Sequence, residues 1–90
     1  MASESQIKAL IEGRVSTYAV WTIGVTDSPT TRKAVHGNPI KWYQWNADTE
    51  QAARNVESHF IGKGMQGGTG GLGKADYVYI FLDPVGSHQT

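Results

Sequence analysis

Three short segments rich in β-branched and aromatic residues constrain the fold of this chain more than any other feature. They span residues 15–26, 40–46 and 76–82, and their composition is typical of β-strands. The first predicts a single strand of unusual length, two strands or a bulged strand. A helical pattern precedes each segment. This alternation predicts an α+β domain in which helices flank a small sheet of about three strands, with strand direction left open.

Capping residues mark the first expected helix, at residues 3–12. Ser3 and Gln6 fit a capping box, in which each side chain satisfies a free backbone N–H. Gly13 suits a left-handed residue that ends the helix. Apolar residues of this helix are expected to share one face: Ile7, Leu10 and Ile11.

Two further helices are expected at residues 29–36 and 49–62. Ser28 is the expected cap of the second helix, and Pro29 suits its first position because a proline lacks the N–H that would stay unpaired there. Asp48 is the expected cap of the third helix. The apolar stripe of the third helix contains Ala53, Val56, Phe60 and Ile61.

The length, charge and cysteine content exclude several function classes. The 90 residues fit one domain, with a loose tail expected from about residue 83. The absence of cysteine excludes disulfides, zinc–thiolate sites, iron–sulfur clusters and thiol nucleophiles. Eight Lys and Arg balance eight Asp and Glu, which argues against a highly basic nucleic-acid coat protein. Without a secretory signal or an apolar run of about 18 residues, the expected location is the cytoplasm, with no membrane contact.

A glycine-rich segment at residues 62–74 invites comparison with a phosphate-binding loop. Gly68 to Lys74 matches the spacing GxxxxGK, but Ala75 replaces the Ser or Thr that would hold Mg²⁺. The segment also follows an expected helix and precedes an expected strand, the reverse of the order in a P-loop. We therefore interpret it as a connector or lid, with a binding role as the alternative.

Alternation along the expected strands distributes the aromatic residues over two faces. Trp42 points opposite to Tyr43 and Trp45, whereas Tyr77, Tyr79 and Phe81 share a face. Core packing is the simplest role for such residues. Any aromatic side chain left at a surface can stack on a base or contact a partner protein.

Glu57 is the most informative single residue. On a helix its same-face neighbours are Ala53, Phe60 and Ile61, so a carboxylate lies in or beside the apolar stripe. Burial of an unpaired carboxylate is unfavourable by several kcal/mol, about 2 or more. Glu57 is therefore expected to have a cation, a metal ion or access to water at the edge of the stripe.

Arg32 and His36 form an i, i+4 pair on the second expected helix and share a face. The planar guanidinium suits phosphate oxygens, and an imidazole exchanges protons near neutral pH. The pair is thus a candidate anion site. The alternative is a solvated helix face on which His36 complements the helix dipole.

Together these residues resemble the GIY-YIG nuclease domain. Thr22-Ile23-Gly24 stands where that family has its YIG strand, and Arg32 follows Gly24 at the spacing of the family's arginine. His36 lies four residues after the arginine, as a histidine often does in the family. Residues 52–61 look like the family's helix, with Glu57 in the position of its glutamate.

The resemblance covers roughly residues 20–62 and implies roles for three of them. The glutamate, here Glu57, would bind a divalent metal ion, Mg²⁺ or Mn²⁺. The arginine, here Arg32, would steady the scissile phosphate, and a tyrosine would help to activate the attacking water. His36 would take that role where no tyrosine reaches the site.

Two family tyrosines lack a counterpart at the usual positions. Thr22 replaces the tyrosine of YIG, and no GIY strand precedes it. We predict that the C-terminal strand at residues 76–82 takes the place of the missing first strand, as in a circular permutation. Tyr77 or Tyr79 would then stand in for the lost tyrosine. This hypothesis requires the C-terminal strand to pair with the strand at residues 20–26.

Three function classes fit these residues. The first is a divalent-metal-dependent endonuclease domain acting on DNA phosphodiester bonds, with Lys33 and Lys41 as substrate-binding residues beside Arg32 and His36. The second is a catalytically inactive relative that binds nucleic acid. The third is an interaction module that pairs with itself or with a partner protein through its aromatic surface.

Overall fold

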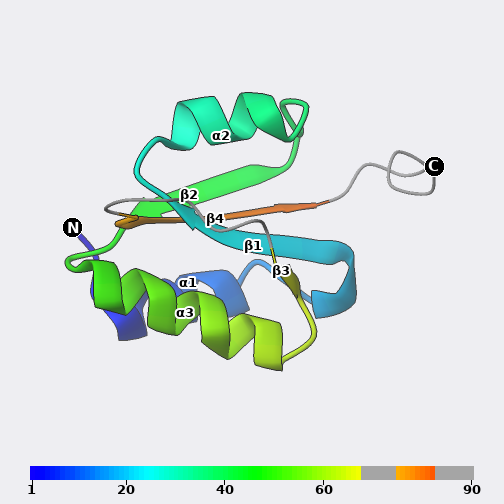
Figure 1. The fold of residues 1–90 in the computed structure, drawn as a ribbon. Coiled ribbons are helices and arrows are strands. Elements are labelled where there is room, and N and C mark those ends of the chain that lie inside the picture. Colours follow the sequence, from blue (N-terminus) through cyan, green and yellow to red (C-terminus); the bar gives the residue numbers. More distant parts are fainter. Residues whose placement is uncertain (68–74, 83–90) are drawn as a thin grey trace.

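A four-stranded mixed sheet lies at the centre of the protein (Figure 1). The computed structural model describes residues 1–67 and 75–82. The strands are β1 (Trp21–Thr26), β2 (Trp42–Asn46), β3 (Gln66–Gly67) and β4 (Tyr77–Leu82), in the spatial order β2-β4-β1-β3. β4 is antiparallel to β1 and to β2, whereas β3 is parallel to β1. The predicted α+β class is confirmed, with one short strand more than expected.

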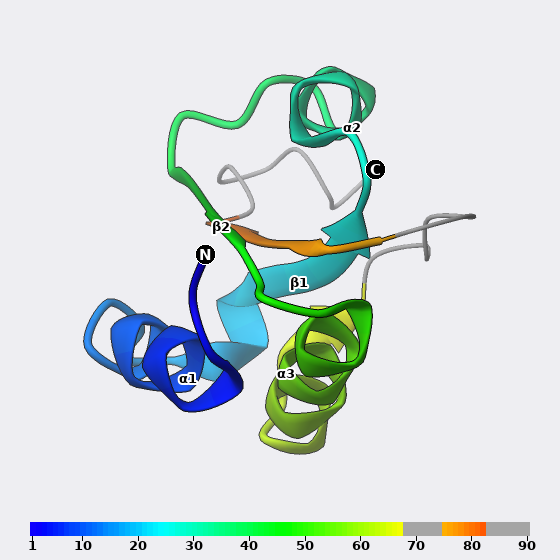
Figure 2. The same cartoon turned by 90° about the vertical axis from the view of Figure 1, so that its left-hand side faces the viewer.

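The helices form a layer on each side of the sheet. They are α1 (Glu4–Glu12), α2 (Pro29–Val35) and α3 (Glu50–Gly62), and a 3₁₀ turn, η1 (Tyr18–Val20), leads into β1. α1 and α3 lie together against one face, and α2 crosses the other face alone (Figures 1 and 2). Within the described residues, none of the helices has the length and hydrophobicity that a bilayer crossing requires.

The strand register determines which side chains face each layer. Gly24 pairs with Tyr79, and Thr22 pairs with Phe81. Because successive side chains alternate, the strands divide into two sets. Facing α1 and α3 are Trp21, Ile23, Val25, Tyr43, Trp45, Val78 and Ile80. Facing α2 are Thr22, Gly24, Thr26, Trp42, Gln44, Tyr77, Tyr79 and Phe81. The predicted alternation of the aromatic residues is therefore confirmed.

The hydrophobic core lies between the sheet and the α1–α3 layer. The helices contribute six buried side chains: Ile7, Ile11, Ala52, Ala53, Val56 and Phe60. Full burial of a large aliphatic or aromatic side chain stabilises a fold by about 1.5–3 kcal/mol. Leu10 and Ile61, both expected on these stripes, are 44% and 43% exposed instead. The core stripe of each helix is thus narrower than the sequence pattern predicts.

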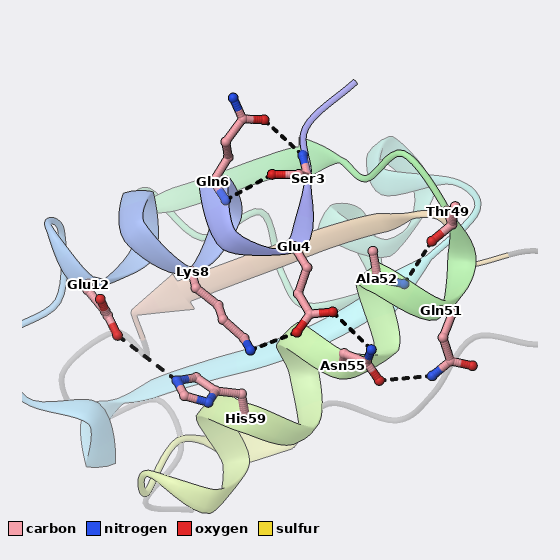
Figure 3. A network of polar contacts seen from close by, with 10 residues as sticks. All are labelled: Ser3, Glu4, Gln6, Lys8, Glu12, Thr49, Gln51, Ala52, Asn55 and His59. Atoms are coloured by element: carbon pink, nitrogen blue, oxygen red, sulfur yellow. Dashed lines mark hydrogen bonds and ion pairs between the residues drawn. The ribbon is translucent and has the colours of Figure 1, made fainter.

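Polar contacts on the surface align α1 with α3 (Figure 3). The Glu4 carboxylate accepts hydrogen bonds from Lys8 Nζ at 2.8 Å and from Asn55 Nδ2 at 2.9 Å. These two bonds, that of Lys8 first, lower the pKa of Glu4 below its ordinary value. At the other end of α1, Glu12 Oε2 lies 4.0 Å from His59 Nε2. The bond from Asn55 links α3 to the first turn of α1.

The capping predictions are partly right. The capping box of Ser3 and Gln6 is present. Gly13 ends α1 in a right-handed conformation, with φ −74°, so the left-handed end predicted there is wrong. The cap of α3 is Thr49, whose hydroxyl accepts from the Ala52 N–H at 3.0 Å, and not Asp48.

The expected strand at residues 15–26 and the glycine-rich segment at residues 62–74 differ most from the prediction. Only the second half of residues 15–26 forms a strand, because η1 occupies residues 18–20. β3 lies inside the glycine-rich segment that was expected to be a connector or lid, and residues 68–74 of that segment are outside the described residues. The tail expected from residue 83 is also outside them.

Candidate functional site

An aromatic cluster occupies the α2 face of the sheet. Tyr79 and Phe81 come from β4, Trp42 comes from β2, and His36 is the residue that ends α2. The Trp42 ring stacks on Tyr79 with centroids 4.7 Å apart and planes 8° apart. The His36 ring lies 4.6 Å from Phe81. This cluster joins α2 to the sheet, since no residue within α2 itself is buried.

Tyr79 lies at the centre of this cluster and is fully buried. Its hydroxyl oxygen is 3.1 Å from His36 Nε2, within hydrogen-bond distance. Gly24 allows the ring to lie flat, because a Cβ at that position would overlap the Tyr79 hydroxyl and ring. The phenol therefore rests on the backbone of β1, the strand against which α3 packs from the other side.

The electrostatics of Tyr79 connect both layers. Burial raises the pKa of its hydroxyl, the positive charge of Arg32 lowers that pKa, and the negative charge of Glu57 raises it further. The net shift is upward, so the phenol stays protonated at neutral pH. Tyr79 is consequently a hydrogen-bonding partner for His36 and a poor base by itself.

Arg32 and His36 share one side of α2, as predicted from their spacing. Both side chains are half-buried, and the His36 N–H donates to the Arg32 carbonyl at 3.1 Å at the end of the helix. The structure thus brings Arg32, His36 and Tyr79 into one neighbourhood. A guanidinium and an imidazole on the same helix face suit a phosphate oxygen and its proton.

Glu57 lies in the other layer, on the side of α3 that also carries Arg54. Its side chain is half-buried beside Ala53, as the stripe position predicted. Burial raises the pKa of this carboxyl, and the charge of Arg54 opposes the shift. Arg54 is itself paired with Glu50, at 2.9 Å. Glu57 therefore carries a partly desolvated charge, and its described link to the α2 face is its electrostatic effect on Tyr79.

The other predicted residues surround this neighbourhood. Tyr77 is half-buried on the same face as Tyr79, opposite Thr26 and Asn46. Lys33 is half-buried on α2, and Lys41 is exposed just before β2. Within residues 1–67 and 75–82, the hydrogen bond and ring contacts of Tyr79 include none of these three side chains.

The carboxylate expected to hold a divalent metal ion, Glu57, belongs to the α3 layer, whereas Arg32 and His36 belong to the α2 layer. Within residues 1–67 and 75–82, no group of three or more His, Cys, Asp or Glu side chains is placed to hold an ion. Mg²⁺ commonly keeps several waters and binds through one or two carboxylates together with substrate phosphates. A single partly desolvated carboxylate, Glu57, is compatible with that donor set.

Sequence reasoning missed two residues that shape the site. Trp42 was assigned to the face opposite Tyr43, but its stacking on Tyr79 depends on a strand pairing that no local pattern specifies. Gly24 entered only as part of a motif, although its missing side chain is what accommodates the phenol. A lone glycine within a strand is a signal of such a close approach.

Comparisons with protein-family models, with curated proteins and with solved structures found no match to this chain.

Proposed function

We propose that this protein is a nuclease-type domain that engages a DNA phosphodiester through Arg32 and His36 and hydrolyses it with a divalent metal ion held by Glu57. The observation that carries the proposal is the environment of Tyr79. His36 is within hydrogen-bond distance of its hydroxyl, and the charges of Arg32 and Glu57 both act on its pKa. The contact between His36 and Tyr79 joins α2 to β4, whereas Arg32 and Glu57 act on Tyr79 only through their charges.

Each residue has a distinct role in this proposal. Arg32 binds the phosphate and stabilises the charge that grows on its oxygens. The half-buried His36 exchanges the proton of the attacking water, whereas the fully buried Tyr79 orients His36 and is a positioning residue. A bound Mg²⁺ would supply further polarisation of the phosphate, with Glu57 as its protein ligand.

The sheet topology supports the permutation on which the family resemblance depends. β4 pairs antiparallel with β1 over residues 77–82, as the hypothesis required. Within β4, Tyr79 and not Tyr77 lies opposite Gly24. We therefore assign Tyr79 as the counterpart of the family's missing tyrosine.

A second candidate function is nucleic-acid binding without cleavage. The observation that favours it is the separation of the helices that carry the charged groups: α2, which contains Arg32, and α3, which contains Glu57, lie on opposite faces of the sheet (Figure 1). Tyr79 is also closed to solvent. In this second candidate function, Arg32 binds phosphates and no metal ion takes part.

The test is nicking of supercoiled plasmid with Mg²⁺ or Mn²⁺. We expect nicking by the wild type, reduced about 100-fold or more by Arg32→Ala and by Glu57→Gln. Glu12→Gln is the matched control, because it removes the same charge from a half-exposed carboxyl on α1. Nicking that survives both site substitutions would exclude this site.

Binding separates the remaining classes. Without nicking, a salt-dependent affinity for DNA that falls in Arg32→Ala would favour the binding module over the endonuclease. If the protein shows neither nicking nor DNA binding, self-association in sedimentation or capture of a partner protein would favour the interaction module.

Metal binding has its own readout, independent of cleavage. Millimolar Mg²⁺ should raise the Tm of the wild type and leave that of Glu57→Gln unchanged, because a ligand of the folded state stabilises it by mass action. An equal rise in both proteins would remove Glu57 as the metal ligand.

A further inference from the structure

Ile40 is held in solvent by a loop that is anchored on both sides. It is 97% exposed, more than any other large apolar residue in the described chain. On one side, the Asn38 N–H donates to the Lys33 carbonyl at 2.9 Å, and Pro39 is buried. On the other side, the Lys41 carbonyl accepts from the Leu82 N–H at 3.1 Å. The exposure of Ile40 is therefore imposed by the fold and is not a fraying end.

The backbone of this loop is itself unusual. Gly37 and Asn38 both have positive φ values, 83° and 52°, which reverse the chain directly after α2. The reversal leaves Ile40 at the tip of the connection. Ile is branched at Cβ and therefore stiff at χ1, so it presents a fixed apolar projection.

The segment of sequence that carries this projection is basic. Between Asp27 and Asp48 the sequence contains Arg32, Lys33 and Lys41 and no acidic residue, a formal charge of +3. Because the whole chain is neutral, the remaining residues carry −3. The neutral total therefore includes a basic segment between α2 and β2, and this local charge favours a polyanion as its ligand.

The loop is continuous with the candidate site. Ile40 and Lys41 lead directly into Trp42, which stacks on Tyr79. The Tyr79 hydroxyl in turn lies beside His36. A polyanion bound at Lys41 would therefore also meet Ile40. Ile40 lies a few residues along the chain from the groups proposed to act on a phosphodiester.

We propose that Ile40 is a wedge that inserts between the base pairs of a nucleic-acid duplex, while Lys33 and Lys41 bind the phosphates on either side. Apolar side chains inserted at a base step unstack it and bend the duplex, which brings more backbone into contact with the protein. Basic charge favours this occupant over an apolar protein pocket. The inference rests on the proposed function, since both require a nucleic acid on the α2 face.

The test uses a duplex oligonucleotide that contains 2-aminopurine, whose emission rises when its base step is unstacked. We expect wild-type protein to raise the emission at saturation, and Ile40→Ser to abolish that rise. Loss of the buried Ile contact should also weaken binding about 10- to 100-fold. Val35→Ser is the matched control, because Val35 is a 65% exposed, β-branched residue at the end of α2.

Lys41→Ala tests the phosphate contacts separately. We expect a weaker affinity whose salt slope is smaller by about 1, with the full emission rise once the duplex is saturated. An unchanged salt slope would remove Lys41 from the phosphate contacts.

The outcomes distinguish this inference from the proposed function. If the wild type nicks or binds duplex and Ile40→Ser behaves like it in both emission and affinity, the wedge is overturned and the proposed function stands. If the wild type binds no duplex at low salt, both the wedge and the proposed function are overturned. A contact with a partner protein is then the remaining role for Ile40.

Discussion

The face of the sheet under α1 and α3 and the face under α2 are built from different side chains. The first is closed mainly by aliphatic residues together with Phe60 and Trp21, and Tyr43 and Trp45 pack at its border. The second carries threonines, Gln44, three aromatic rings of β4 and the half-buried Arg32 and His36. An apolar layer of the first kind stabilises the fold. A face that mixes buried aromatic rings with basic groups offers recognition chemistry, so we expect function to lie there.

The largest expected effect lies on the closed face. Phe60→Ala removes a fully buried ring that contacts Tyr18 with centroids 5.8 Å apart, and it should lower the free energy of unfolding by about 3–5 kcal/mol. Val35→Ala on α2 should change it by less than about 0.5 kcal/mol. Urea denaturation measures both. Similar losses would contradict the asymmetry between the two faces.

Gly24→Ala tests how tightly the second face is packed. The added methyl group would overlap Tyr79, and we expect a loss of about 1–3 kcal/mol from overpacking. Gly62→Ala is the control, since a Cβ there meets open space and its effect should be neutral or stabilising. A neutral Gly24→Ala in thermal unfolding would show that Tyr79 moves aside freely.

Tyr79→Phe removes the hydroxyl beside His36 and keeps the stacked ring. We expect a loss of about 0.5–1.5 kcal/mol, typical of one hydrogen bond, and a shift of the His36 titration followed by NMR. Tyr77→Phe is the same chemical change two residues away on the same face and should leave that titration unmoved. Equal His36 titration curves in the wild type, Tyr79→Phe and Tyr77→Phe would show that the Tyr79 hydroxyl does not act on His36.

Glu57→Gln should have the smallest effect, and of opposite sign. Because the pKa of Glu57 is raised in the folded state, the folded protein binds more protons than the unfolded chain between the ordinary value of 4.5 and the raised value. The charged carboxylate therefore lowers stability above that window. Glu57→Gln should raise the Tm at pH 7 and leave it nearly unchanged well below pH 4.5. A lower Tm at pH 7 would mean that the carboxylate is a structural partner.

Local sequence patterns predicted most of the helices and strands, but fewer of the contacts between them. The helices were predictable because capping and periodicity are local, as with Ser3 and Gln6. The cap of α3 was misplaced by one residue because Asp48 and Thr49 are both good caps and only the backbone geometry selects one. The strand β3 contains one glycine in two residues, so no propensity could indicate it.

The sequence indicated which residues to consider for the candidate site, but not how these residues are arranged in space. The spacing of Arg32 and His36 predicted their shared helix face correctly. That Glu57 lies in the opposite layer follows from which face of the sheet each helix covers, and a helical pattern carries no information on that choice. The hydrogen-bond distance between His36 and Tyr79 joins residues 43 positions apart in the chain, and only the completed sheet creates it.

The position of β4 has a consequence for how the chain folds. β4 follows every other described element in the sequence, yet it lies between β1 and β2 and is the only described strand that pairs with β2. During synthesis from the N-terminus, β2 therefore has no described strand partner, and β1 has only the short β3, until residues 77–82 leave the ribosome. Such late, long-range closure slows folding and exposes strand edges to other chains. A nascent chain stalled before Tyr77 should be protease-sensitive throughout, with no folded N-terminal portion.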